Sequence, residues 1–146
     1  MIGTMRIFLP VLLLVFATVA VAEDKKVIQP KEFAPGKPFS PGILVDGTLY
    51  IVGQTGGDLK TGQVPDDFEA EVKTALDNVG IILREAKLDF KDVVSVQVFL
   101  TDMDLFPKMN GVYTTYFHEP RPVRTTVGVM RLVGKSRIEI TVTAHK

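Results

Sequence analysis

The stretch from Asp66 to Thr101 decides the fold: DDFEAEVKTALDNVGIILREAKLDFKDVVSVQVFLT. It begins after Pro65 with a D-x-x-E arrangement, Asp66 and Glu69, which is typical of a helix N-terminus. Apolar residues then recur at the helical period on one face, namely Phe68, Val72, Ala75, Leu76, Val79, Leu83 and Ala86. From 92 to 101 the apolar residues alternate with others, as in a strand. The stretch therefore predicts a helix that packs against a sheet.

The segment before this helix predicts a β-hairpin. Residues 27–41 are rich in Pro and Gly and indicate an extended lead-in. Apolar runs at 43–45 and 49–52 then flank Asp46-Gly47, a strong signal for a tight turn. The second run ends in a glycine-dense loop at 53–57.

The segment after this strand predicts a second helix and two more strands. The helix follows Asp104 and tolerates Pro107 in its first turn. The strands are expected at 123–132 and 136–144, joined at 133–135. The order is thus hairpin, helix, strand, helix and two strands. It predicts a two-layer α+β domain in which one mixed sheet carries both helices on a single face. The strands are apolar enough that self-association is the expected cover for the other face.

The N-terminus predicts export. Arg6 precedes an apolar run that ends in Ala20-Val21-Ala22, and Glu23 begins a charged segment. This pattern is typical of a secretory signal peptide at 1–22, which leaves a domain at 23–146 in the periplasm or outside the cell. An uncleaved membrane anchor is the alternative, although the run is shorter than the roughly 20 residues of a spanning helix.

The composition excludes several kinds of function. Without Arg6, 16 Lys and Arg face 17 Asp and Glu, so neither nucleic acid nor, after signal cleavage, a membrane is an expected partner. The chain has no cysteine and two histidines far apart, His118 and His145, so no metal site is expected. The few serines do not form a nucleophile motif. Gly134-Lys135-Ser136 lacks the upstream glycine of a phosphate-binding loop.

Arg124 and Glu139 are the strongest candidates for chemistry. Arg124 lies in a predicted strand with Thr126 and Gly128 on the same face, which leaves space in front of a guanidinium. Glu139 lies between two isoleucines and therefore projects from the opposite face to theirs. An arginine fork matches a substrate carboxylate, and a glutamate can position water. The alternative is that both are solvated charges or form an interface salt bridge.

The same residues carry a family resemblance. The segments 122–129 and 137–140, PVRTTVGV and RIEI, resemble the C-terminal signature of the RidA (YjgF-like) family. Upstream, Val52-Gly53-Gln54 with 60–65, 76–79 in the first helix, and Asn110 with Tyr113 in the second helix are similar to further family segments. The resemblance extends over roughly 38–144 in order and with similar spacing.

The resemblance implies a chorismate-mutase-like fold, a homotrimer with ligand sites between subunits, and no cofactor. The implied activity is hydrolysis of small carboxylate-bearing enamines and imines to 2-keto acids and ammonium. Arg124 is then expected to hold the substrate carboxylate, and Glu139 to orient the attacking water. Gly53, with its backbone N–H, and Asn110 are expected in the same cleft.

Three positions depart from the deaminase pattern. Val52 stands where Ser or Thr is common, Phe39 where an aromatic hydroxyl is expected, and Thr126 where Cys is frequent. Phe39 cannot donate a hydrogen bond, so the substrate-binding pocket is more apolar than the pattern predicts. A non-catalytic binder or sensor of small carboxylates therefore stays open as an alternative. Ribonuclease activity is a third and weaker alternative, because the predicted domain lacks a basic patch.

Overall fold

The computed structural model describes residues 24–146. The predicted signal peptide, 1–22, lies outside the described residues. Among the residues that are described, no helix is both long and apolar enough to cross a membrane. Within the same range, no group of three or more His, Cys, Asp or Glu side chains is arranged to hold a metal ion.

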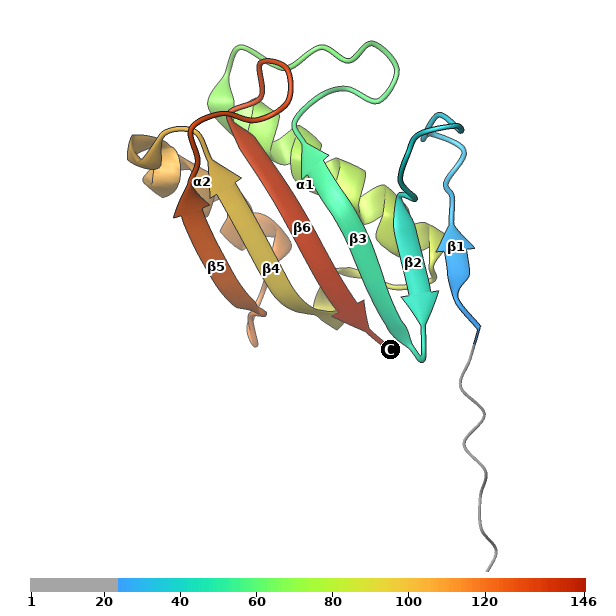
Figure 1. The fold of residues 1–146 in the computed structure, drawn as a ribbon. Helices are drawn as coiled ribbons and strands as arrows, with labels where there is room; N and C mark the ends of the chain where they lie inside the picture. The colour runs from blue at the N-terminus through green and yellow to red at the C-terminus, as the bar shows by residue number, and fades with distance from the viewer. Residues whose placement is uncertain (1–23) are drawn as a thin grey trace, which may run out of the picture.

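Two helices and one six-stranded mixed sheet make up the fold (Figure 1). The strands lie side by side in the order β1-β2-β3-β6-β4-β5, in which β4 and β5 run parallel and every other neighbouring pair is antiparallel. The elements are β1 (Lys26–Ile28), β2 (Gly42–Val45), β3 (Thr48–Thr55), α1 (Phe68–Glu85), β4 (Val93–Leu100), α2 (Phe106–Tyr116), β5 (Val123–Gly128) and β6 (Ile138–His145). The predicted α+β class and element order are confirmed, and β1 adds a short strand within the predicted lead-in.

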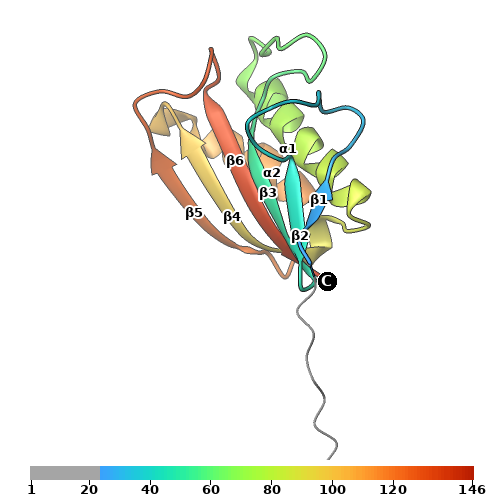
Figure 2. The same ribbon diagram turned by 45° about the vertical axis from the view of Figure 1, so that its right-hand side comes forward.

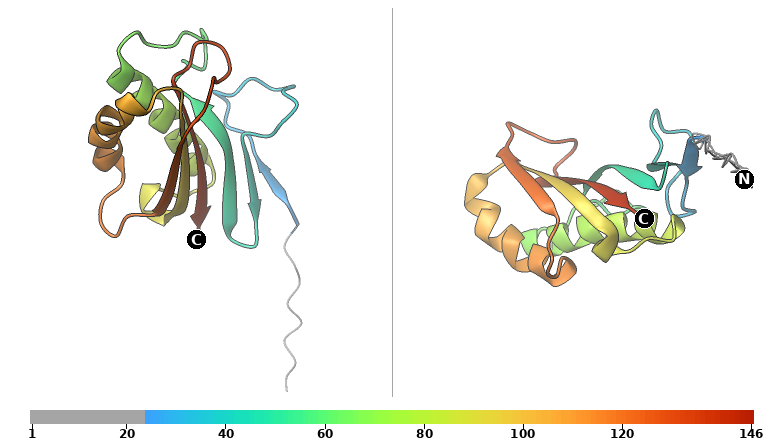
Figure 3. Two further views of the ribbon diagram at one scale, coloured as in Figure 1. Left: turned by 60° about the vertical axis from the view of Figure 1, so that its left-hand side comes forward. Right: turned by 90° about the horizontal axis from the view of Figure 1, so that it is seen from below.

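Both helices cover the same face of the sheet. Figure 2 shows α1 and α2 behind the strands, and the view from below in Figure 3 shows the two layers edge-on. The apolar stripe of α1 is buried against β3 and β6, where Leu49, Ile51, Ile138 and Ile140 are at most 3% exposed. In the described part of the chain, 24–146, the other face of the sheet carries no helix.

The N-terminus of α1 differs by one residue from the prediction. Asp67, not Asp66, is the N-cap, and its carboxylate accepts a hydrogen bond of 2.8 Å from the backbone N–H of Ala70. Phe68 therefore begins the helix and is buried. The capping chemistry is the expected one, but two adjacent aspartates satisfy the same sequence pattern.

The hairpin turn has the geometry that its sequence predicts. Asp46 and Gly47 both have positive φ, 47° and 73°, and Val45 pairs with Thr48 across them. Two successive left-handed residues define the type I′ turn, whose twist matches that of the flanking strands.

The two C-terminal strands are shorter than the sequence predicts. β5 ends at Gly128 instead of Leu132, and β6 starts at Ile138 instead of Ser136. The reason lies in the neighbouring strand, because β4 ends at Leu100, opposite Gly128. The N–H of Val129 still reaches the carbonyl of Leu100 at 2.8 Å, and beyond it the apolar run forms a loop.

Candidate active site

Arg124 lies between β5 and α2 and is held by apolar side chains. It pairs with Val96 in the parallel β4–β5 ladder and so shares the helix-facing side of the sheet. Its guanidinium carbon lies 4.5 Å from the ring centroid of Tyr113 and 5.5 Å from that of Phe106. Nη1 lies 3.9 Å from the sulfur of Met109. Within residues 24–146 no carboxylate forms an ion pair with Arg124, so its N–H donors are available to a ligand.

Two hydroxyl groups around Arg124 also lack partners. Thr126 follows two residues later on the same face of β5, and its Oγ1 is buried without a hydrogen bond in the described part of the chain. The hydroxyl of Tyr113, a residue only 3% exposed, is buried and unpaired in the same way. Burial raises the pKa of Tyr113, and the charge of Arg124 partly opposes the shift. A buried hydroxyl without a partner costs roughly 1–3 kcal/mol, which a bound water can recover. Asn110, next to Met109 on α2, is half-buried.

Glu139 lies on the other face of the sheet, against Gly53. It pairs with Phe99 of β4 and Thr55 of β3. Val52 and Gly53 form a bulge in the β3–β6 ladder, where two residues oppose Thr141 alone. A Cβ on Gly53 would come within 1.9 Å of a carboxylate oxygen of Glu139. Only glycine therefore allows this carboxylate to lie against the backbone of β3.

A cavity of about 890 Å³ opens beside this bulge. Phe39, Gly53 and Gln54 line it, with residues of the loops at 57–64 and 133–136. Phe39 is 53% exposed and presents an apolar ring where the family resemblance predicts a hydroxyl. Val52 is half-buried and does not line this cavity.

The predicted site residues thus form two groups within one chain. Arg124 and Thr126 lie with α2 on the helix-facing side, whereas Glu139 lies on the open side against Gly53. Within residues 24–146 of one chain, Arg124 and Glu139 lie on opposite faces of the sheet and do not share a cleft.

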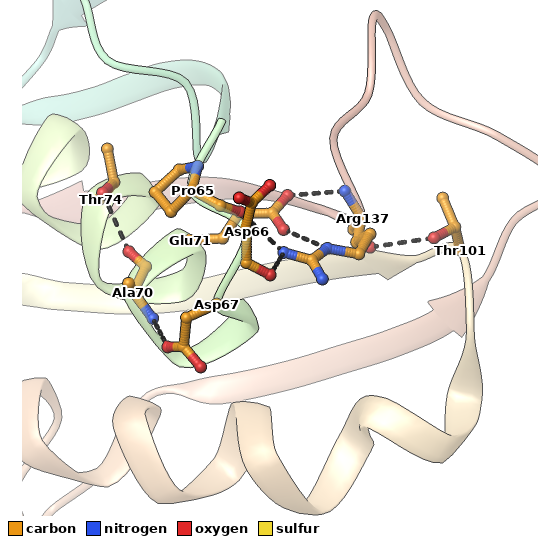
Figure 4. Close-up of polar contacts among 8 residues, drawn as sticks. All are labelled: Pro65, Asp66, Asp67, Ala70, Glu71, Thr74, Thr101 and Arg137. Carbon is orange, nitrogen blue, oxygen red and sulfur yellow. Dashed lines mark hydrogen bonds and ion pairs between the residues drawn. The ribbon is translucent and has the colours of Figure 1, made fainter. Parts of the chain in front are cut away.

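Sequence reasoning missed three further residues with close contacts to these groups. Tyr113 was recognised only as a family and packing residue, although its ring supports the guanidinium of Arg124. Glu71 is fully buried and bound to Arg137, two residues before Glu139 (Figure 4). The available signal for Glu71 was its position between Phe68 and Ala75 on the apolar stripe of α1.

Comparison with known proteins places the chain in a family. The endoribonuclease L-PSP family matches residues 29–146. A mouse protein named 2-iminobutanoate/2-iminopropanoate deaminase is 44% identical over 104 residues, 70% of this chain and 77% of its own length. The solved structure of the E. coli YjgF gene product has a TM-score of 0.76 and 34% identity, and the match covers 83% of this chain and 98% of that one. E. coli TdcF, solved with bound serine, has the same TM-score at 31% identity, with coverages of 83% and 98%.

By its α+β fold the chain belongs to the same structural class as these solved structures. The chain belongs to the RidA (YjgF-like) family, which the endoribonuclease L-PSP description denotes. The name of the mouse relative supports the hypothesis that this chain is an imine deaminase.

Proposed function

We propose that the protein hydrolyses small carboxylate-bearing enamines and imines to 2-keto acids and ammonium. The observation that carries this proposal is the guanidinium of Arg124, which lies by the rings of Tyr113 and Phe106 and has no carboxylate partner among residues 24–146. A guanidinium fixed in this way suits bidentate binding of a carboxylate. The serine bound to the relative TdcF is a small ligand with such a carboxylate.

The reaction requires mainly that the site orients the imine and the attacking water. In the imine tautomer, water adds to the electrophilic C=N carbon, and the resulting carbinolamine expels ammonia to leave the keto acid. Glu139 takes a proton from the attacking water and returns one to the leaving nitrogen. Placing water and imine together accounts for much of the acceleration available to such a site.

We propose further that the site forms between two copies of the chain. The two groups lie on opposite faces of one sheet, so Arg124 of one subunit must meet Glu139 of another. The apolar residues on the open face, which include Val123 at 71% exposure, favour such self-association. A homotrimer with a site in each intersubunit cleft is the proposed assembly.

The proposal also places the protein outside the cytoplasm, on the basis of the predicted signal peptide. Protein isolated from its native source should begin at Glu23. A retained Met1 or Arg6 in the intact mass would contradict cleavage.

The experiment is a turnover assay with enamines generated in situ. Release of 2-keto acid is followed for the wild-type protein and for Arg124→Ala, with size-exclusion chromatography to confirm assembly of both. We expect release from the wild type and loss of at least about 100-fold in the variant, since the carboxylate is no longer oriented. Equal rates for both proteins would contradict the assignment.

A non-catalytic carboxylate binder is the second candidate, and Phe39 is the observation that favours it. The exposed ring supplies no hydrogen-bond donor at the cavity. Arg124-dependent binding of a 2-keto acid, measured by calorimetry, without any turnover would support this second function.

A further inference from the structure

An ion pair between a fully buried carboxylate, Glu71, and the partly exposed Arg137 connects the first turn of α1 to the start of β6. Glu71 is 0% exposed, and its carboxylate accepts hydrogen bonds of 2.6 Å from both the backbone N–H and Nε of Arg137 (Figure 4). Short bonds to both carboxylate oxygens make this a charge-assisted, two-point contact. Glu71 therefore constrains the backbone of residue 137 as well as its side chain.

Arg137 makes further contacts that fix the same region. Its Nη2 donates to the carbonyls of Pro65 and Asp66 at 2.9 and 3.0 Å, just before α1 begins. Its own carbonyl accepts from the backbone N–H of Thr101 at 3.0 Å, at the end of β4. The residue thus joins the start of α1, the end of β4 and the start of β6.

The segment from Gly53 to Gly56 lies against both glutamates. A Cβ on Gly56 would come within 2.2 Å of Cγ of Glu71, and a Cβ on Gly53 would meet Glu139. Glycine is thus needed at both ends of this short segment. Its position is defined by Glu71 at one end, while Glu139 rests on the other.

We propose that Glu71 and Arg137 are positioning residues for Glu139. The pair fixes the strand start two residues before Glu139 and the backbone on which the carboxylate of Glu139 rests. This inference rests on the proposed function, in which Glu139 orients the attacking water. It adds the means by which a half-buried glutamate on the open sheet face is held at a defined place.

The location of Arg124 makes this role separable from simple stability. Arg124 lies on β5, on the sheet face opposite to Glu139, and its guanidinium contacts the ring of Tyr113 on α2. In the described range, 24–146, Arg124 forms no hydrogen bond or ion pair with Glu71 or Arg137. Loosening the pair should therefore displace the water-orienting group while the carboxylate-binding group stays in place.

The experiment measures kcat and keto-acid affinity separately in Glu71→Gln and Arg137→Lys. The Glu71→Gln side chain keeps a hydrogen-bond acceptor but loses the negative charge. The Arg137→Lys side chain keeps the positive charge but loses the planar set of N–H donors of the guanidinium. We expect kcat to fall by on the order of 10- to 100-fold, as for a displaced reacting group. The Kd of the 2-keto acid product, measured by calorimetry, should stay within about twofold.

A matched control and a second variant complete the test. Lys73→Ala removes an exposed ion pair on the same helix, Lys73–Asp77, and should leave kcat unchanged. Gly53→Ala displaces Glu139 directly without touching the pair and should reproduce the loss of kcat even if Arg137→Lys does not fold.

Three results would overturn the inference. One is an unchanged kcat in folded Glu71→Gln, and another is a parallel loss of kcat and affinity in the positioning variants. Both leave the deaminase function standing if the wild type turns over. Absence of turnover in the wild type overturns the deaminase function and the positioning role with it.

Discussion

The cation at Arg124 has aromatic and thioether neighbours in place of a counter-ion. A guanidinium over ring faces is attracted by the ring quadrupoles and is weakly hydrated, so it tolerates this environment. The ring of Tyr113 is itself fixed by stacking on Phe117, with centroids 4.3 Å apart. Phe117 is 1% exposed, so the support reaches into the core. The ring of Tyr113 thus orients the fork without occupying its donors.

Replacing Tyr113 tests this support. Tyr113→Leu removes the ring and should weaken binding of a 2-keto acid about 2- to 30-fold, since a cation–π contact contributes about 0.5–2 kcal/mol. Tyr113→Phe keeps the ring and should bind within about threefold of the wild type, because the hydroxyl has no partner within the described chain. Calorimetric titration of both variants measures the difference. Equal weakening in both would assign the effect to the hydroxyl and not to the ring.

Elements with strong local signals were predicted well from the sequence. The apolar period of α1 and the Asp46-Gly47 turn act between residues close in sequence, and both are confirmed. The end of β5 was missed because it depends on β4, which stops at Leu100. Strand length is thus set by the pairing partner, whereas the composition of residues 127–132 does not indicate where that partner ends.

The candidate site was predictable in part for the same reason. Arg124 and Glu139 stand in a recognisable segment, so the resemblance selected them. The support of Arg124 by Tyr113 joins two different elements, and the pair Glu71–Arg137 joins residues 66 positions apart in the chain. The sequence indicated the Glu71–Arg137 pair only through the position of Glu71 on the apolar stripe of α1. The face of Glu139 relative to its isoleucine neighbours was predicted from the alternation, whereas the helix-facing position of Arg124 followed only from the strand register.

Complete removal of one partner from the buried pair should destabilise the domain strongly. Arg137→Ala leaves the carboxylate of Glu71 buried without its cation, at a cost of about 3–5 kcal/mol in the free energy of unfolding. Urea denaturation of the variant measures this cost. Lys73→Ala breaks an exposed pair instead and should cost less than about 1 kcal/mol. A loss for Arg137→Ala no larger than for Lys73→Ala would contradict the assigned burial of Glu71.

The contact between α1 and α2 should make stability sensitive to alkaline pH. Burial, together with the hydrogen bond to Asp77 at 2.6 Å, raises the pKa of Tyr116 from 10.0 to about 12. The phenol therefore stays neutral in the fold where the unfolded chain would ionise. Its contribution to stability is complete below pH 10 and is lost as the pH rises through 12.

Denaturation at successive pH values measures this dependence. The free energy of unfolding should decline between pH 10 and 12, and Tyr116→Phe should decline less over the same range. The difference between the ultraviolet absorbance titrations of the folded wild type and of Tyr116→Phe reports the Tyr116 phenol among the three tyrosines. An identical decline in the variant would assign the effect to other groups.

At the scale of the whole molecule, the uncovered face of the sheet is the main feature. It carries Val123 and Val127 of β5, which are 71% and 41% exposed, and Tyr50 of β3, which is 53% exposed. Glu139 lies on the same face, beside Phe99. A second copy that covers this face would bury apolar surface and bring its own residues to Glu139. Self-association and formation of the site are then a single event.

Mixing two inactive variants tests this coupling. Arg124→Ala keeps Glu139, and Glu139→Ala keeps Arg124, so each variant alone should lack turnover. In a ring of mixed subunits, a site is intact only where a subunit with Arg124 meets a neighbour with Glu139. Random assembly at equal amounts meets this condition at about a quarter of the interfaces, whatever the number of subunits in the ring.

The two variants are unfolded together, refolded as a mixture and assayed for 2-keto acid release. About a quarter of wild-type activity is expected, against none when the separately refolded proteins are combined without exchange. A site built within one chain would give no recovery, because every subunit then carries one defect. Since recovery requires both residues from different subunits, its size measures how completely the site depends on assembly.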